Sequence, residues 1–188
     1  MSEARKLLGD AFQRDRDTYA LDRRRIWIDV DELHRLRAEA EAASGERQQA
    51  LFERGLALFR GQPLAGMDGL WASSETRRLC ALQIELLDRA SRVRLEAGEI
   101  IGALEGAELA HVLDPSNEQP VQLAMEAEAA LGRRDVVIER YERLGRELEE
   151  RFGLEPSRET KLLYRRLLSQ DGPGPSSSRE DSGAQGRS

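Results

Sequence analysis

An internal repeat that aligns residues 97–99 with residues 131–133 is the feature of this sequence that most limits its possible folds. The tripeptide Ala97-Gly98-Glu99 then corresponds to Leu131-Gly132-Arg133. Five further pairs of positions, all small or apolar except for one tyrosine, align at the same offset: Leu87 with Val121, Ala90 with Ala124, Ala103 with Val137, Ala107 with Tyr141, and Ala110 with Leu144. Such a period is typical of repeated helical hairpins, in which each hairpin buries one face against its neighbour.

Small residues occupy positions where the aligned helices would pack. Ala90, Ala103 and Ala124 have side chains short enough to let two helix backbones approach closely. Pro115 follows the second helix of the first hairpin, where a residue without a backbone N–H can end a helix. The period is that of the tetratricopeptide repeat (TPR), so we expect a mainly all-α fold of TPR-like stacked helical hairpins. An ordinary helical bundle is the alternative, because Ala and Leu at helical spacing are common there too.

Further helices are predicted on both sides of the repeat. Asp29 begins the first, since its carboxylate can cap free amides and Glu32 completes a capping-box pattern. A closing helix is expected to cover the exposed end of the stack, as repeat arrays require. The predicted helices span residues 29–45, 46–59, 75–97, 100–113, 118–131, 135–152 and 159–169. The closing helix directs four leucines inward: Leu162, Leu163, Leu167 and Leu168.

An apolar, glycine-rich connection from Leu64 to Trp71 separates the second and third of these helices. We expect it to fold back over the helices with Trp71 buried in the core, because a large aromatic residue at a helix entry is more often buried than exposed. The alternative is that Trp71 is a hot spot for a partner. Ser73 or Ser74 is expected to cap the helix that follows.

Residues 1–28 have a different pattern. Residues 2–8 are typical of a helix end, which Gly9 stops. Two β-rich runs, 12–14 and 18–21, flank a short turn and predict a β-hairpin, and residues 26–28 form a third β-rich piece. A unit of this size buries too little surface to be stable alone, so we expect it to rest on another part of a protein.

Composition and charge exclude several classes of function. The 188 residues are 39% hydrophobic and 34% charged, with a net charge of −6, which argues against a nucleic-acid footprint over the whole protein. Cys80 is the only cysteine and the two histidines, His34 and His111, lie far apart, so neither a disulfide nor a metal site is expected. Residues 171–188 are rich in Gly, Pro, Ser and charge, which predicts a disordered tail.

The motifs of the common enzyme classes are absent from the sequence. It contains no glycine-rich phosphate loop, nucleophile elbow or His-Glu-x-x-His motif, so we expect no enzymatic activity and no cofactor. No apolar run reaches the ~18–20 residues of a membrane span. The N-terminus does not read as a signal peptide, so a cytoplasmic location without membrane contact is expected.

Three ordered motifs resemble the bacterial transcriptional activator domain (BTAD). Residues 56–66 read LALFRGQPLAG and precede Trp71, residues 113–118 read LDPSNE, and residues 152–160 read FGLEPSRET. The match covers about residues 29 to 169. The resemblance implies a regulator of transcription whose BTAD/TPR-like helical domain spans residues 29–170.

In SARP-type regulators this domain follows an OmpR-like winged-helix DNA-binding domain, and residues 3–28 resemble the last part of such a domain. The segment EARKLLG resembles the end of its recognition helix, and residues 14–21 resemble its wing. The resemblance implies that residues 1–28 are a truncated winged-helix remnant, with most of the DNA-reading part missing.

Arginines in this N-terminal segment are possible contacts for the DNA backbone, as wing residues are in winged helices. They are Arg14, Arg16, Arg23, Arg24 and Arg25. Phosphate contacts position a protein without specifying a base sequence. Because aspartates alternate with these arginines and dilute their field, we expect DNA binding to be weak or to depend on the missing domain.

Polar residues on the first helix of each hairpin form a possible partner groove. They are Glu85, Asp88, Arg92, Gln119, Gln122 and Glu126. Such groups suit a peptide or a partner helix, although the face could also be merely solvated. The resemblance implies a protein partner, either another copy of the regulator or transcription machinery such as RNA polymerase. Two alternatives stay open: a free-standing TPR-like adaptor, and a ligand-sensing helical domain with a pocket beside the Leu64–Trp71 connection.

Overall fold

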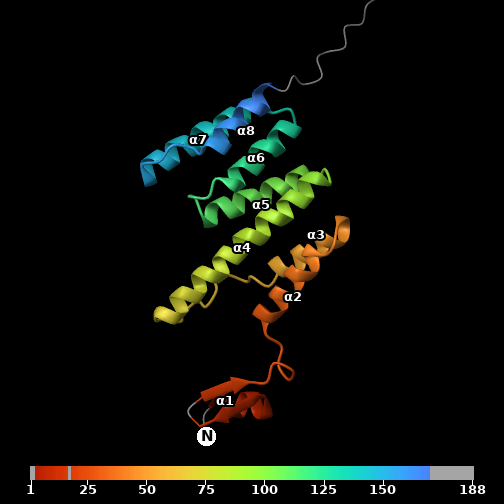
Figure 1. The fold of residues 1–188 in the computed structure, drawn as a ribbon, viewed down its shortest axis with the longest axis vertical. Coiled ribbons are helices and arrows are strands. Elements are labelled where there is room, and N and C mark those ends of the chain that lie inside the picture. The colour runs from red at the N-terminus through yellow and green to blue at the C-terminus, as the bar shows by residue number, and fades with distance from the viewer. Residues whose placement is uncertain (1–2, 17, 170–188) are drawn as a thin grey trace, which may run out of the picture.

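A computed structural model describes residues 3–16 and 18–169 of the chain (Figure 1). Its elements are α1 (Glu3–Leu8), the short 3-10 helix η1 (Gly9–Ala11), β1 (Phe12–Asp15), β2 (Thr18–Leu21), α2 (Asp29–Glu41), α3 (Gly45–Leu56), α4 (Leu70–Glu96), α5 (Ile100–Leu113), α6 (Gln119–Ala130), α7 (Arg134–Phe152) and α8 (Arg158–Ser169). The predicted tail, residues 171–188, lies outside the described residues.

The helices from α2 onward stack in chain order along the long axis of the molecule (Figure 1). Each of α2 to α6 packs against the next helix in the chain, as expected of consecutive hairpins. The last helix, α8, packs against both α6 and α7 and so covers the end of the stack. The prediction of a mainly α-helical fold built from stacked hairpins, with a short β-hairpin in front, is confirmed.

The repeat in the sequence corresponds to the same local structure in both hairpins. Gly98 and Gly132 follow α4 and α6 and have φ angles of 81° and 74°, a left-handed conformation that favours glycine. The amide that follows Gly98, that of Glu99, donates a hydrogen bond of 2.8 Å to the carbonyl of Arg94, and the amide that follows Gly132, that of Arg133, makes the equivalent bond to Glu128 over 3.0 Å. The first helix of each hairpin, α4 or α6, therefore ends in the same type of turn.

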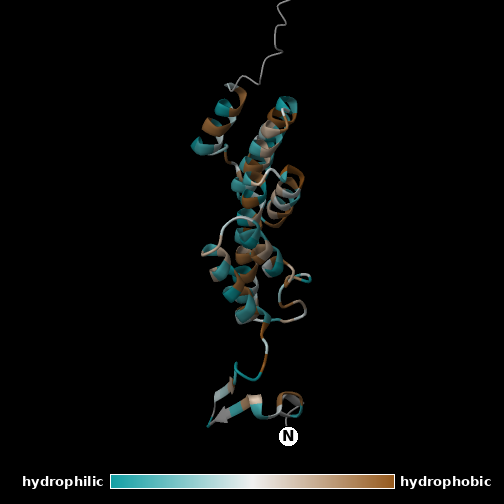
Figure 2. Ribbon diagram, turned by 90° about the vertical axis from the view of Figure 1, so that its right-hand side faces the viewer, coloured by the Kyte–Doolittle hydropathy of each residue, from teal (hydrophilic) through white to brown (hydrophobic). Residues whose placement is uncertain are grey.

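Side chains at most of the aligned positions are buried alike, and the exception is Tyr141, which is half-buried where its counterpart Ala107 is buried. Ala90 and Ala124 are 1% and 2% exposed, and Ala103 and Val137 are 0% and 1% exposed. Further apolar residues fill the space between consecutive helices, and the helices of Figure 2 show hydrophobic and hydrophilic residues on different sides. The largest core cluster joins α2, α3 and α4 and contains Leu33, Leu36, Ala40, Leu51, Phe52, Leu82, Leu86 and Ala90. Burial of this apolar surface is the main source of stability in a stack of this kind.

The N-terminal unit lies at one end of the molecule, joined to the stack by residues 22–28 (Figures 1 and 2). Strands β1 and β2 pair antiparallel, with Phe12 opposite Leu21. The rings of Phe12 and Tyr19 stack with their centroids 5.3 Å apart. Residues 26–28, the third β-rich piece of the sequence, do not form a strand in the structure, because they lie in the connection directly before α2.

The expected burial of Trp71 is also wrong. Helix α4 begins at Leu70 rather than near residue 75, directly after Gly69, whose φ angle is 109°. Ala72 then faces the core at 2% exposure, and Trp71, one residue earlier on the helix, remains 64% exposed. Neither Ser73 nor Ser74 caps the helix, since both lie inside α4, and the hydroxyl of Ser73 donates to the carbonyl of Gly69 over 3.1 Å.

The closing helix buries fewer leucines than expected. Leu163 and Leu167, one turn apart, are 9% and 8% exposed and face α6 and α7. Leu162 is 51% exposed, so its predicted inward position is wrong, and Leu168 is half-buried. The helix turns about 100° per residue, so only one stripe of these four side chains can face the stack.

Candidate partner-binding face

The first helices of the hairpins and the closing helix share one side of the stack. Helix α4 packs against α6, and α6 packs against α8. Ion pairs connect α2 to α4 along the same side. We call this surface, formed by α2, α4, α6 and α8, the A-helix face.

Ion pairs cover the part of the A-helix face between α2 and α4. The carboxylate of Glu85 on α4 lies 2.8 Å from the guanidinium of Arg37 on α2 and 3.0 Å from that of Arg89. Arg89 also reaches Glu41 of α2 over 3.2 Å. Glu85, one of the predicted groove residues, is therefore paired with one arginine of α2 and with one arginine of its own helix.

A single carboxylate connects three helices farther along the face. Arg92 of α4 contacts one oxygen of Glu126 on α6 at 3.2 Å, and Arg166 of α8 contacts the other oxygen at 3.2 Å. Arg92 and Glu126 are separated by one repeat period and so occupy equivalent places in the two hairpins. The structure thus brings these two predicted residues together across the repeat interface.

The other two predicted residues of α6 have different environments. The side-chain amide of Gln122 donates a hydrogen bond of 2.7 Å to the hydroxyl of Thr160 on α8, and Thr160 is 0% exposed. The same hydroxyl donates to the carboxylate of Glu118 over 2.5 Å. Gln119, at the start of α6, is exposed. Gln122 therefore has a structural role as well as its place on the face, whereas Gln119 is free to contact a partner.

Asp88 is the least satisfied of the predicted residues. Its Oδ1 atom is buried and accepts no hydrogen bond from the described residues. Burial raises the pKa of the Asp88 carboxyl above its ordinary value of 3.8, although Arg92 and Arg89 act in the opposite direction. A carboxylate desolvated in this way lowers the stability of the fold at neutral pH.

The A-helix face combines equal numbers of acidic and basic side chains that are only partly buried. They are Glu41, Glu85, Asp88 and Glu126, together with Arg37, Arg89, Arg92 and Arg166. Exposed ion pairs of this kind contribute only about 0–1 kcal/mol each, so they can exchange partners at little cost. Such a face can bind a polar protein segment that also carries both signs of charge.

Sequence reasoning did not find the residues that α2 and α8 contribute to this face. Arg37, Arg89, Thr160 and Arg166 all pair with predicted residues. The repeat covers α4 to α7 only, so it carries no signal for α2 or α8. Arg89 lies on α4, but its partner Glu41 on α2 could not be inferred from the repeat.

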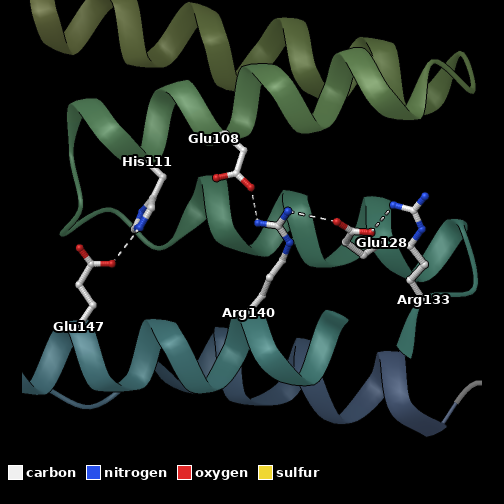
Figure 3. A network of polar contacts seen from close by, with 6 residues as sticks. All are labelled: Glu108, His111, Glu128, Arg133, Arg140 and Glu147. Carbon is white, nitrogen blue, oxygen red and sulfur yellow. Dashed lines mark hydrogen bonds and ion pairs between the residues drawn. The ribbon is translucent and has the colours of Figure 1, made fainter. Parts of the chain in front are cut away.

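A second polar network joins α5, α6 and α7 (Figure 3). The guanidinium of Arg140 on α7 contacts Glu128 of α6 at 3.1 Å and Glu108 of α5 at 2.5 Å. The side chains of Glu128 and Arg140 are 5% and 13% exposed. Arg133 contacts Glu128 from the outside at 3.4 Å, with its own side chain 53% exposed. This network is structural, because its central charges are shielded from solvent and already paired.

Arg23 and Arg25, which are among the predicted DNA-contacting arginines, pair with aspartates. Arg23 contacts Asp31 at 2.9 Å, and Arg25 lies 3.5 Å from Asp22. Arg24 is exposed. Arg16 occupies the hairpin turn, and Arg14 lies on β1 with a side chain outside the described part of the chain. Pairing of this kind reduces the local positive field, as the alternation with aspartates predicts.

The described residues contain no group of three His, Cys, Asp or Glu side chains that could hold a metal ion. Within the same residues, no helix combines the length and apolar character that crossing a membrane requires.

The chain belongs to the bacterial transcriptional activator domain family, whose model matches residues 28–168. It is also similar to the regulatory protein AfsR of Streptomyces griseus, with 32% identity over 178 residues. That alignment covers 90% of this chain and 18% of AfsR, so the chain spans less than a fifth of the length of this relative. The resemblance to the BTAD of SARP-type regulators is confirmed, and the family is one of transcription regulators rather than enzymes.

Proposed function

We propose that the chain is a module of a transcriptional regulator that acts by contact with another protein through the A-helix face. Family membership supports the regulatory role. The observation that supports the A-helix face as the binding surface is the row of paired but partly exposed charges from α2 to α8. The Arg92–Glu126–Arg166 bridge lies at the centre of this row. A free-standing adaptor unrelated to transcription is disfavoured by the same family membership.

The partner that best fits this face is a second copy of the chain. A surface with four acids and four arginines in alternation complements itself when two copies meet about a two-fold axis. RNA polymerase or another domain of the regulator is the second possibility implied by the family. Both partners would use the same residues, so one set of variants tests them together.

The test is size-exclusion chromatography with light scattering over a range of protein concentrations, followed by biolayer interferometry against RNA polymerase. Arg92→Glu reverses a charge at the centre of the A-helix face, where the Arg92 side chain is 46% exposed. Arg146→Glu makes the same change on an exposed residue of α7, outside the face. We expect Arg92→Glu to weaken association and Arg146→Glu to leave it unchanged. Equal binding by the two variants would contradict the assignment.

We further propose that residues 1–28 are the remnant of a winged-helix domain, with residues 3–28 corresponding to its last part, and that the protein works in the cytoplasm. A helix followed by an antiparallel hairpin supports this interpretation. Because Arg23 and Arg25 pair with aspartates, we expect a mobility-shift assay with promoter DNA to show only weak retardation that salt abolishes. A tight, sequence-selective complex would refute this expectation.

A further inference from the structure

A cavity of about 400 Å³ lies where the segment from the N-terminal unit meets the helical stack. Trp27 of that segment forms one wall, and the start of α2 forms another. The turn after α3, residues 58–65, and Leu79 of α4 complete it. The ligand-sensing alternative expects a pocket beside the Leu64–Trp71 connection, and Leu64 and Ala65 of that connection line this cavity, although Trp71 does not.

The lining is mainly apolar and includes two aromatic rings. Leu33 and Leu79 belong to the core and are 3% and 6% exposed. Phe59 is half-buried, and Trp27 is 65% exposed although it faces the cavity. Cavities of ~300–1,000 Å³ with an apolar lining and a few polar groups are typical of small-molecule sites. An exposed tryptophan at the cavity wall leaves apolar surface that a ligand can cover.

Two charged groups on the cavity wall differ in their pairing. Arg60 is exposed and makes no ion pair or side-chain hydrogen bond with any described residue. Asp29 already accepts a hydrogen bond of 2.8 Å from the amide of Val30. The unpaired guanidinium favours an anionic ligand group, whereas the carboxylate of Asp29 on the same wall disfavours a ligand with two negative charges.

Backbone strain occurs at the same wall. Leu64 has a φ angle of 55°, a left-handed conformation that is unfavourable for a residue with a branched side chain. Two hydrogen bonds hold this turn, one from the amide of Met67 to the carbonyl of Leu64 at 3.0 Å and one from the hydroxyl of Thr76 to the carbonyl of Pro63 at 3.3 Å. Strained residues that the surrounding structure fixes cluster at ligand sites.

We propose that this cavity binds a small amphipathic monoanion, with a flat apolar body between Trp27 and Phe59 and a carboxylate beside Arg60. A ligand in this position contacts both the segment that carries the N-terminal unit and the first helices of the stack. It would therefore restrict Trp27 and, with it, the position of the N-terminal unit. The cavity is lined by other residues of α2 and α4 than those of the A-helix face, and its binding does not depend on the function proposed for that face.

The experiment uses 1-naphthaleneacetate as the probe and its neutral analogue 1-naphthaleneacetamide as the charge control. In a Trp71→Phe background, Trp27 is the only tryptophan, and its fluorescence reports on the cavity. We expect saturable quenching by the carboxylate. Arg60→Gln should raise the dissociation constant of the carboxylate at least tenfold and leave binding of the amide unchanged. Arg47→Gln, which removes an exposed arginine at the start of α3, should change neither constant.

A second variant tests the cavity itself. Ala65 is exposed and lines the rim, so Ala65→Phe can fill the space without disturbing the core. It should abolish binding of both probes by fluorescence and by isothermal titration calorimetry, with the thermal midpoint unchanged. The proposal is overturned if neither probe binds saturably to the parent protein by either method. It is equally overturned if Arg60→Gln and Arg47→Gln bind the carboxylate alike.

Discussion

The hydroxyl of Ser91 on α4 occupies the space that a Cβ atom on Gly106 of α5 would need. An added Cβ would lie 2.1 Å from Ser91 Oγ but 3.5 Å from Ser91 Cβ. Ser91 is 0% exposed, and its hydroxyl has no hydrogen-bond partner among the described residues. The absence of a side chain at Gly106 therefore sets how closely the two helices of the first hairpin pack.

Gly106→Ala is expected to lower the free energy of unfolding by about 1–3 kcal/mol through overpacking. Ser91→Ala alone should be neutral or stabilising, because it removes a buried hydroxyl that lacks a partner. The double variant should recover most of the loss, since the two methyl groups then meet at an ordinary contact distance. Urea unfolding of all four proteins measures this coupling. Losses that simply add would contradict the close approach of the two helices.

Thr160 connects the closing helix to α6 through its hydroxyl, which binds Gln122 and Glu118. Thr160→Val keeps the shape of the side chain but leaves buried polar groups without a partner, so we expect a loss of about 1–3 kcal/mol. Thr160→Ser keeps the hydroxyl and should lose less, about 1 kcal/mol for one methyl group. Chemical unfolding compares the two variants. A larger loss in the serine variant would show that the methyl group, rather than the hydrogen bonds, secures α8.

The raised pKa of Asp88 gives a pH-dependent prediction. Because the pKa is higher in the folded state, folding favours the protonated carboxyl. The resulting contribution to the free energy of unfolding is fully present below the ordinary pKa of 3.8 and is lost as the pH rises through the folded-state pKa. Asp88→Asn should therefore be more stable than the parent protein at pH 7, and the difference should shrink toward pH 3.5. Thermal unfolding from pH 3.5 to 8 measures it. Asp68→Asn, at an exposed loop position, is the control and should show no such trend.

In the network of Figure 3, the carboxylate of Glu128 forms one buried ion pair, with Arg140, and one exposed ion pair, with Arg133. Arg140→Met leaves the buried carboxylate of Glu128 without its main partner, and breaking such a pair costs about 3 kcal/mol or more. Arg133→Met removes the exposed partner and should change stability by less than about 1 kcal/mol. Urea unfolding distinguishes the two losses. Similar values would mean that Glu128 is solvated in solution.

The sequence predicts the stacked hairpins well, because the period places small residues such as Ala90 and Ala124 at matching packing positions. It also predicts the turns after α4 and α6, since glycine is favoured at a left-handed position. The start of α4 could not be predicted, because the serines near residue 73 resemble a cap and a helix beginning at Leu70 exposes a tryptophan. The contacts of Arg37 and Arg166 depend on how α2 and α8 pack, which no local pattern encodes.

The A-helix face is the surface through which we propose that this regulator binds its protein partner. The most direct measurement is the dissociation constant of the parent protein for itself and for RNA polymerase, compared with a variant that combines Arg92→Glu and Arg166→Glu. Both arginines contact Glu126, and their side chains are 46% and 61% exposed, so the fold should tolerate the reversal of their charges. We predict at least a tenfold weaker association for the double variant, with Arg146→Glu unchanged. Unaltered association of the double variant, or no association of the parent protein with either partner, would show that the A-helix face is not the binding surface.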